Sequence, residues 1–248
     1  MSFDMEYRTL TFFPCNFTNT SRVGYQWYAT EGEGYSAHVS GAITSLPDPP
    51  VGSHTELSDA DFDDDETATL SFAGSNSLYE TFPYYDTPAH AVRVYSYGGL
   101  GLVSCETSED VPCTGRLPTA WTDVQRFLFG GFWRANAVCL LCVDGARVNA
   151  ETGAPLKTRI FHKILGEGTE NERLVVSYIQ DDAPYRHRQA AFYLATGAVA
   201  LSYLGVGWGE PNKTVVGLSR GVTPHWQANS YNGLDLRGAA SRESRDVV

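Results

Sequence analysis

Hydrophobic and polar positions alternate over short segments along most of this chain, as in half-buried β-strands. In residues 91–97, for example, Val92 and Val94 are separated by an arginine, and Tyr95 and Tyr97 by a serine. We expect strands over Tyr7–Phe13, Tyr25–Ala29, Thr67–Phe72, Ala91–Tyr97, Leu156–Leu165, Leu174–Gln180, Ala190–Leu194, Val199–Val206 and Lys213–Leu218. Late in the chain they recur at the spacing of about 8 to 12 residues typical of sandwiches and barrels.

The longest apolar and aromatic run is Arg126–Val143. A Gly-Gly pair at 130–131 and two arginines interrupt it, so it is too short and broken to cross a bilayer. We predict a central strand buried on both faces. The segment Thr119–Arg126, which follows Pro118, is the best candidate for a helix and leads into that strand.

Turn residues divide these segments. Gly98-Gly99 ends one strand, Asp144-Gly145 is a strong signal for a tight hairpin, and Gly166–Asn171 predicts another turn. We expect a helical turn over Ser77–Phe82, ending before Pro83 because the residue before a proline avoids helical geometry.

The predicted fold class is all-β: an antiparallel, jelly-roll-like sandwich with long loops and one or two short helices. A chain of 248 residues, 42% hydrophobic and 19% charged, has the size of one large β-domain, so we expect a single domain over residues 1–248. A Pro-rich and then acidic loop at about 46–66 is predicted to stay solvated, and the polar tail at about 238–248 to be flexible.

The net charge of −11 argues against strong nucleic-acid binding, since there is no excess of Lys and Arg to contact phosphates. We also expect no membrane insertion. The N-terminus lacks the basic and apolar regions of a signal peptide. The five cysteines form no regular framework, so a disulfide-stapled secreted domain is not implied.

Two segments have the composition of metal sites. Carboxylates alternate in Asp59–Glu66, which invites a calcium site, but Leu70 stands where an EF-hand loop has its bidentate Glu, and a solvated acidic loop is the alternative. Cys139 and Cys142 have zinc-ligand spacing without a second pair, and on a strand their side chains would point to opposite faces. Buried thiols are the alternative there. We therefore predict no metal and no cofactor.

Catalytic motifs are equally incomplete. His187, between two arginines, is expected in an exposed loop of mixed charge, and a triad of Ser219, His225 and Asp235 lacks a Gly-x-Ser-x-Gly turn. We predict that the chain is not an enzyme.

Aromatic side chains offer a ligand surface, because an amphipathic ring has an apolar face and a polar tip. Four of them are the predicted contacts for a ligand or receptor: Tyr84, Tyr85, Trp208 and Trp226. Packing in the core or an interface is the alternative use.

The helix over Trp121–Arg126 followed by Gly130-Gly131-Phe132-Trp133-Arg134 resembles the jelly-roll coat proteins of the picorna-like RNA viruses. In that family a comparable aromatic stretch ending in Arg opens a core strand and is usually followed by Gly, where this chain has Ala135. Ser71-Phe72 together with Leu78–Phe82 is similar to the segment before the family's early helix, without its arginines. Val222–Tyr231 is similar to a late segment with proline and aromatics.

The resemblance implies a structural virion protein that self-associates, or co-assembles with related coat chains, into an icosahedral capsid in the host cytoplasm, with exposed loops contacting a host receptor. A capsid spike of the astrovirus type is the second resemblance. The competing class is a carbohydrate-binding β-sandwich, either lectin-like or a viral receptor-binding module, which would use the four aromatic residues.

Overall fold

The computed structural model describes eleven segments of the chain in detail. They are residues 8–16, 23–29, 45–50, 52–62, 67–85, 87–95, 98–104, 136–143, 158–180, 187–204 and 214–220.

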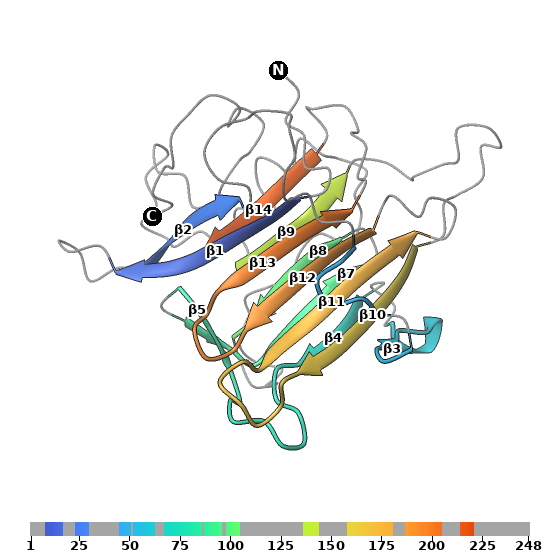
Figure 1. Ribbon diagram of the computed structural model, residues 1–248, viewed down its shortest axis with the longest axis horizontal. Coiled ribbons are helices and arrows are strands. Elements are labelled where there is room, and N and C mark those ends of the chain that lie inside the picture. Colours follow the sequence, from blue (N-terminus) through green and yellow to red (C-terminus); the bar gives the residue numbers. More distant parts are fainter. Residues whose placement is uncertain are drawn as a thin grey trace, which may run out of the picture.

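These segments form two antiparallel sheets that lie face to face (Figure 1). The seven-stranded sheet has the order β2 (Val23–Ala29), β1 (Arg8–Asn16), β13 (Val199–Leu204), β12 (His187–Tyr193), β11 (Arg173–Gln180), β10 (Thr158–Leu165) and β3 (Thr55–Glu56). The five-stranded sheet has the order β14 (Thr214–Arg220), β9 (Asn136–Val143), β8 (Gly99–Val103), β7 (Ala91–Tyr95) and β4 (Thr67–Ser71).

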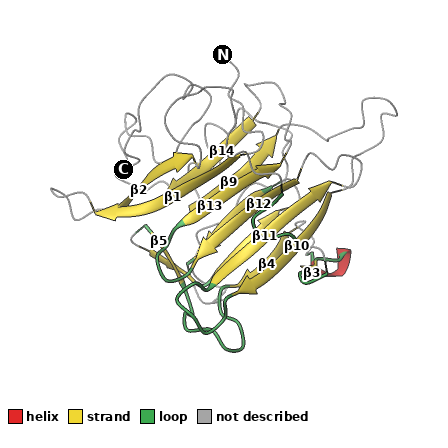
Figure 2. Cartoon of the chain, viewed as in Figure 1, coloured by secondary structure: helices red, strands yellow, loops and turns green. Residues whose placement is uncertain are grey.

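Two smaller elements complete the described structure. A short hairpin pairs β5 (Phe82–Tyr84) with β6 (Thr87–Ala89). A single turn of 3₁₀-helix, Asp59–Asp61, lies beside β3 and is the only helix within the described segments (Figure 2). The predicted all-β antiparallel sandwich is therefore confirmed.

The order of the strands does not confirm a jelly roll. β10 to β13 are successive neighbours in one sheet, and β7 to β9 are successive neighbours in the other. A jelly roll is built from two Greek keys, in which a long connection returns the chain to the first strand. Each of these two runs is a meander, whereas the pairings of β1 with β13 and of β9 with β14 join strands that are far apart in the chain.

The core lies between the sheets and is lined by alternate residues of their strands. In β11, Leu174, Val176 and Tyr178 enter this core, whereas Val175 and Ser177 lie on the other face of the sheet. Val175 and Ser177 are also fully buried, so both faces of this sheet are covered around β11.

Most of the predicted strands are present within a few residues of their expected bounds. The predicted central strand is confirmed over β9, which pairs with β8 on one side and β14 on the other. Ala137 and Val138, successive residues that face opposite ways, are both fully buried. Residues 126–135, the predicted helix at 119–126 and the Asp144-Gly145 turn lie outside the described segments.

Two local predictions are wrong. Ser77–Phe82 is not a helical turn: it forms a loop, and Phe82 begins β5 together with Pro83. His187 is not in an exposed loop, because it begins β12, where the neighbouring Arg188 is only 1% exposed. Most of the described residues of the loop at 46–66 are exposed, as predicted, although Leu46 and Pro50 are buried.

Candidate functional site

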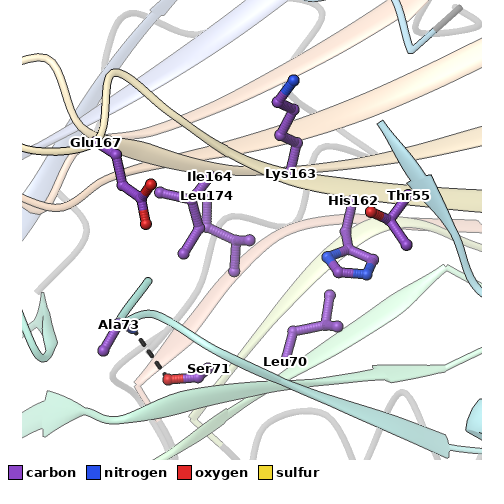
Figure 3. A pocket seen from close by; sticks show the side chains of 9 residues that line it. All are labelled: Thr55, Leu70, Ser71, Ala73, His162, Lys163, Ile164, Glu167 and Leu174. Carbon is purple, nitrogen blue, oxygen red and sulfur yellow. Dashed lines mark hydrogen bonds between the residues drawn. The ribbon is translucent and has the colours of Figure 1, made fainter. Parts of the chain in front are cut away.

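A cleft opens along one side of the sandwich, where β4 of the smaller sheet faces β10 of the larger one (Figure 3). Its volume is about 380 Å³, within the range of small-molecule sites. The lining residues are Thr55, Leu70, Ser71, Ala73, His162, Lys163, Ile164, Glu167 and Leu174.

The inner wall of the cleft is apolar. Leu70 is 8% exposed and Leu174 is 1% exposed, and both belong to the core between the sheets. Ile164 packs against the same core from β10, two residues beyond His162. Figure 3 shows Ile164 and Leu174 between the imidazole of His162 and the carboxylate of Glu167. A bound molecule would therefore contact aliphatic carbon along its middle.

His162 forms one end of the cleft. Desolvation by burial lowers the pKa of this imidazole, and the carboxylate of Asp61 partly opposes that shift. The side chain is therefore neutral at pH 7 and has one hydrogen-bond donor and one acceptor. Lys163 comes next on β10, and its ammonium group points away from the cleft, as alternation along a strand requires (Figure 3).

Glu167 forms the other end, in the turn that joins β10 to β11. Its Oε1 accepts a hydrogen bond of 3.4 Å from the backbone N–H of Asn76. The same oxygen occupies the space that a Cβ on Gly74 would need. The glycine therefore lets the carboxylate lie against the loop that follows β4.

Glu172 fixes this loop to the turn. It is fully buried, and its carboxylate accepts hydrogen bonds from the hydroxyl of Ser77, from the N–H of Leu78 at 2.9 Å and from the N–H of Gly168 at 3.2 Å. The bonds from Ser77 and Leu78 join segments about 90 residues apart in sequence. They hold the loop that follows β4 against the turn between β10 and β11, which also contains Glu167.

Asp48 binds the face of the seven-stranded sheet that points away from the core between the sheets. Its carboxylate pairs with the guanidinium of Arg173 at 2.6 and 3.2 Å. Its backbone exchanges two hydrogen bonds with the side chain of Gln189, which also donates to Ser177. Sequence reasoning missed both Asp48 and Glu172. Nothing local distinguishes either one from the other acidic residues around it.

The predicted contact residues do not form a surface in the described segments. Tyr84 and Tyr85 are 1% and 7% exposed, so the expectation that their rings are available to a ligand is wrong. Their ring centroids lie 4.8 Å apart, and each contacts the ring of Tyr25 in the core. Trp208 and Trp226 lie outside the described residues.

The metal and triad predictions are only partly covered by the structure. Across the described segments, no group of three His, Cys, Asp or Glu side chains lies close enough to hold a metal ion. The acidic segment is described only as far as residue 62, and both cysteines with zinc spacing are on β9. Of the imagined triad, Ser219 is on β14, whereas His225 and Asp235 are not described.

No protein-family model, no curated protein and no solved structure matches this chain. Among the described residues, no helix has the length and apolar character needed to cross a membrane.

Proposed function

We propose that this chain is a structural protein of a non-enveloped virion, which self-associates or co-assembles with related coat chains into a capsid in the host cytoplasm. Its exposed loops would contact a host receptor. The observation that carries the proposal is the edge strand β4. It ends the five-stranded sheet and, among the described strands, pairs only with β7.

The composition of β4 favours pairing with a second chain. Isolated sheet edges are usually protected by charged residues, proline or a bulge. The strand Thr67–Ser71 has the sequence Thr-Ala-Thr-Leu-Ser and none of these devices, and its register with β7 is regular. The side chains of Thr69 and Ser71 are exposed. Another copy of the chain can extend the sheet here with backbone hydrogen bonds.

The interior provides the rigid scaffold that a shell needs. Two buried tyrosines of the larger sheet donate hydrogen bonds to carbonyls of the smaller one: Tyr178 to Tyr95 at 2.8 Å, and Tyr203 to Leu140. A third, Tyr84, donates to Ala137 at 3.0 Å. Each bond contributes about 1 kcal/mol. The first two constrain the relative position of the two sheets, and the third holds the β5–β6 hairpin to the smaller sheet.

Sedimentation velocity at several protein concentrations and ionic strengths tests the proposal, with negative-stain imaging of any fast species. Pentamers, sheets or shells support a coat protein. Thr69→Lys places a charge on β4 and should abolish assembly, whereas Ala195→Lys adds the same charge at an exposed turn and should not.

The other outcomes select among the alternatives. A strict dimer would favour the capsid-spike function over a shell-forming one. A monomer at every concentration would overturn self-assembly by this chain. The carbohydrate-binding alternative would then be tested on a glycan array with Trp208→Ala and Trp226→Ala.

A further inference from the structure

The cleft between β4 and β10 has an arrangement of groups that the proposed assembly does not use. Its middle is aliphatic and its two ends are polar, and the ammonium group of Lys163, the lysine that the described residues contain, points away from it. A ligand that fits must therefore carry an apolar stem and polar ends.

The end at Glu167 selects a cation. The carboxylate lies beside an exposed turn, and the described salt bridges, Arg159–Glu56 and Arg173–Asp48, involve other acidic residues. Its hydrogen bond from Asn76 uses only Oε1 and is long, at 3.4 Å. The remaining capacity of the carboxylate suits a charged N–H donor.

The end of the cleft at His162 can accept a hydrogen bond from a second charged N–H donor. The imidazole is neutral, because burial lowers its pKa, so a ring nitrogen is available as an acceptor. The carboxylate of Asp61 is near enough to interact with the same imidazole and adds negative potential. Among the described residues, His54 is near enough to interact with His162 and with Lys163, and the ammonium group of Lys163 points away from the cleft.

The length of the cleft favours an elongated ligand. His162 and Ile164 are two residues apart on one strand, roughly 7 Å, and Glu167 lies beyond the end of that strand. We propose that this cleft binds a linear aliphatic diamine, with one ammonium group on Glu167, the stem on Ile164 and Leu174, and the second ammonium group at His162.

Isothermal titration calorimetry of the full chain with 1,5-diaminopentane tests this site at low ionic strength, where a charged contact is least screened. The diamine should bind, pentylamine should bind several-fold more weakly, and hexanoate should not bind. No binding of the diamine, or equal binding of hexanoate, would overturn the proposal.

Variants locate the site. Glu167→Gln should weaken diamine binding about tenfold, because it removes the charge from the hydrogen bond. Glu170→Gln is the matched control: it removes the same charge from an exposed residue of the same turn that does not line the cleft, and affinity should not change. Equal effects of the two variants would mean that only overall charge attracts the diamine, which contradicts the proposal.

Gly74→Ala gives an independent check. The new methyl group takes the position of the Glu167 carboxylate, a flexible group that can move away, so the fold should persist while diamine affinity falls. Unchanged affinity would contradict the assigned geometry.

Discussion

Two parts of the same interior are filled in different ways. Around the β5–β6 hairpin, rings from several segments pack with centroids 4.8 to 6.1 Å apart. Between β4 and β10 the space stays open, and polar side chains border it. Leu70 and Phe72 stand two residues apart and belong to different parts: Phe72 stacks on Phe82, and Leu70 lines the cleft. Aromatic side chains fill the space between the sheets near the β5–β6 hairpin. Between β4 and β10 there are no such aromatic contacts among the described residues, and a cleft of about 380 Å³ remains.

The largest expected effect is in the aromatic part. Phe82→Ala removes a fully buried ring that contacts Phe72, Tyr84 and Phe192, and should lower the free energy of unfolding by about 3–5 kcal/mol. Leu70→Ala should cost nearer 2 kcal/mol, because its side chain already borders an open space. Urea denaturation with unchanged m-values measures both. Equal losses would show that the two parts are equally well packed.

The second largest loss of stability is expected at the loop after β4, which connects the aromatic part to the cleft and is held by Glu172. Glu172→Gln keeps the shape of the side chain but presents an amide N–H to donors that need an acceptor, so it should cost about 2–3 kcal/mol. Glu170→Gln on the same turn should change stability by less than about 0.5 kcal/mol, because that residue is exposed. Denaturation midpoints compare the pair. Similar midpoints would mean that the buried carboxylate does not hold the loop.

A third comparison uses two ion pairs of the seven-stranded sheet. Asp48 and Arg173 are 15% and 22% exposed, whereas Glu56 and Arg159 are 41% and 39% exposed. Asp48→Asn should cost about 1–2 kcal/mol, since it weakens a half-buried, charge-assisted contact. Glu56→Gln should cost less than about 1 kcal/mol and lose its effect in high salt. A larger loss for Glu56→Gln would reverse this ranking.

The alternation of apolar positions was enough to predict most of the longer strands, because successive side chains of a strand point to opposite faces. It missed β8, in which every residue is buried, and the short strands β3, β5 and β6. It could not predict how the strands are ordered. The pairing of β1 with β13 joins residues about 190 apart, and local periodicity contains no information about such a partner.

The cleft was beyond prediction for the same reason. His162 and Leu70 come from different sheets, and Glu167 looks like any other acidic residue of an exposed turn. The prediction for Tyr84 and Tyr85 failed because composition does not tell a buried tyrosine from an exposed one. The hydroxyl of Tyr84, which looked like a polar tip for ligands, donates instead to a backbone carbonyl.

The smallest effect is on pH dependence at the cleft. Burial lowers the pKa of His162 and of His54, so in the folded state both bind a proton less readily than in the unfolded chain. The unfolded chain therefore takes up more protons as the pH falls below about 6.5, and stability should decrease until the folded-state pKa values are passed. His162→Gln should flatten this decrease below about pH 6.5. Asp61→Asn should steepen it, because the carboxylate raises the pKa of His162.

Denaturation at a series of pH values measures how steeply stability depends on pH, and NMR titration of the His162 ring shows which part of that dependence comes from His162. An unchanged slope in His162→Gln would mean that this imidazole is as hydrated in the cleft as in the unfolded chain. The cleft would then not exclude water from its inner wall and would not differ in hydration from a surface groove.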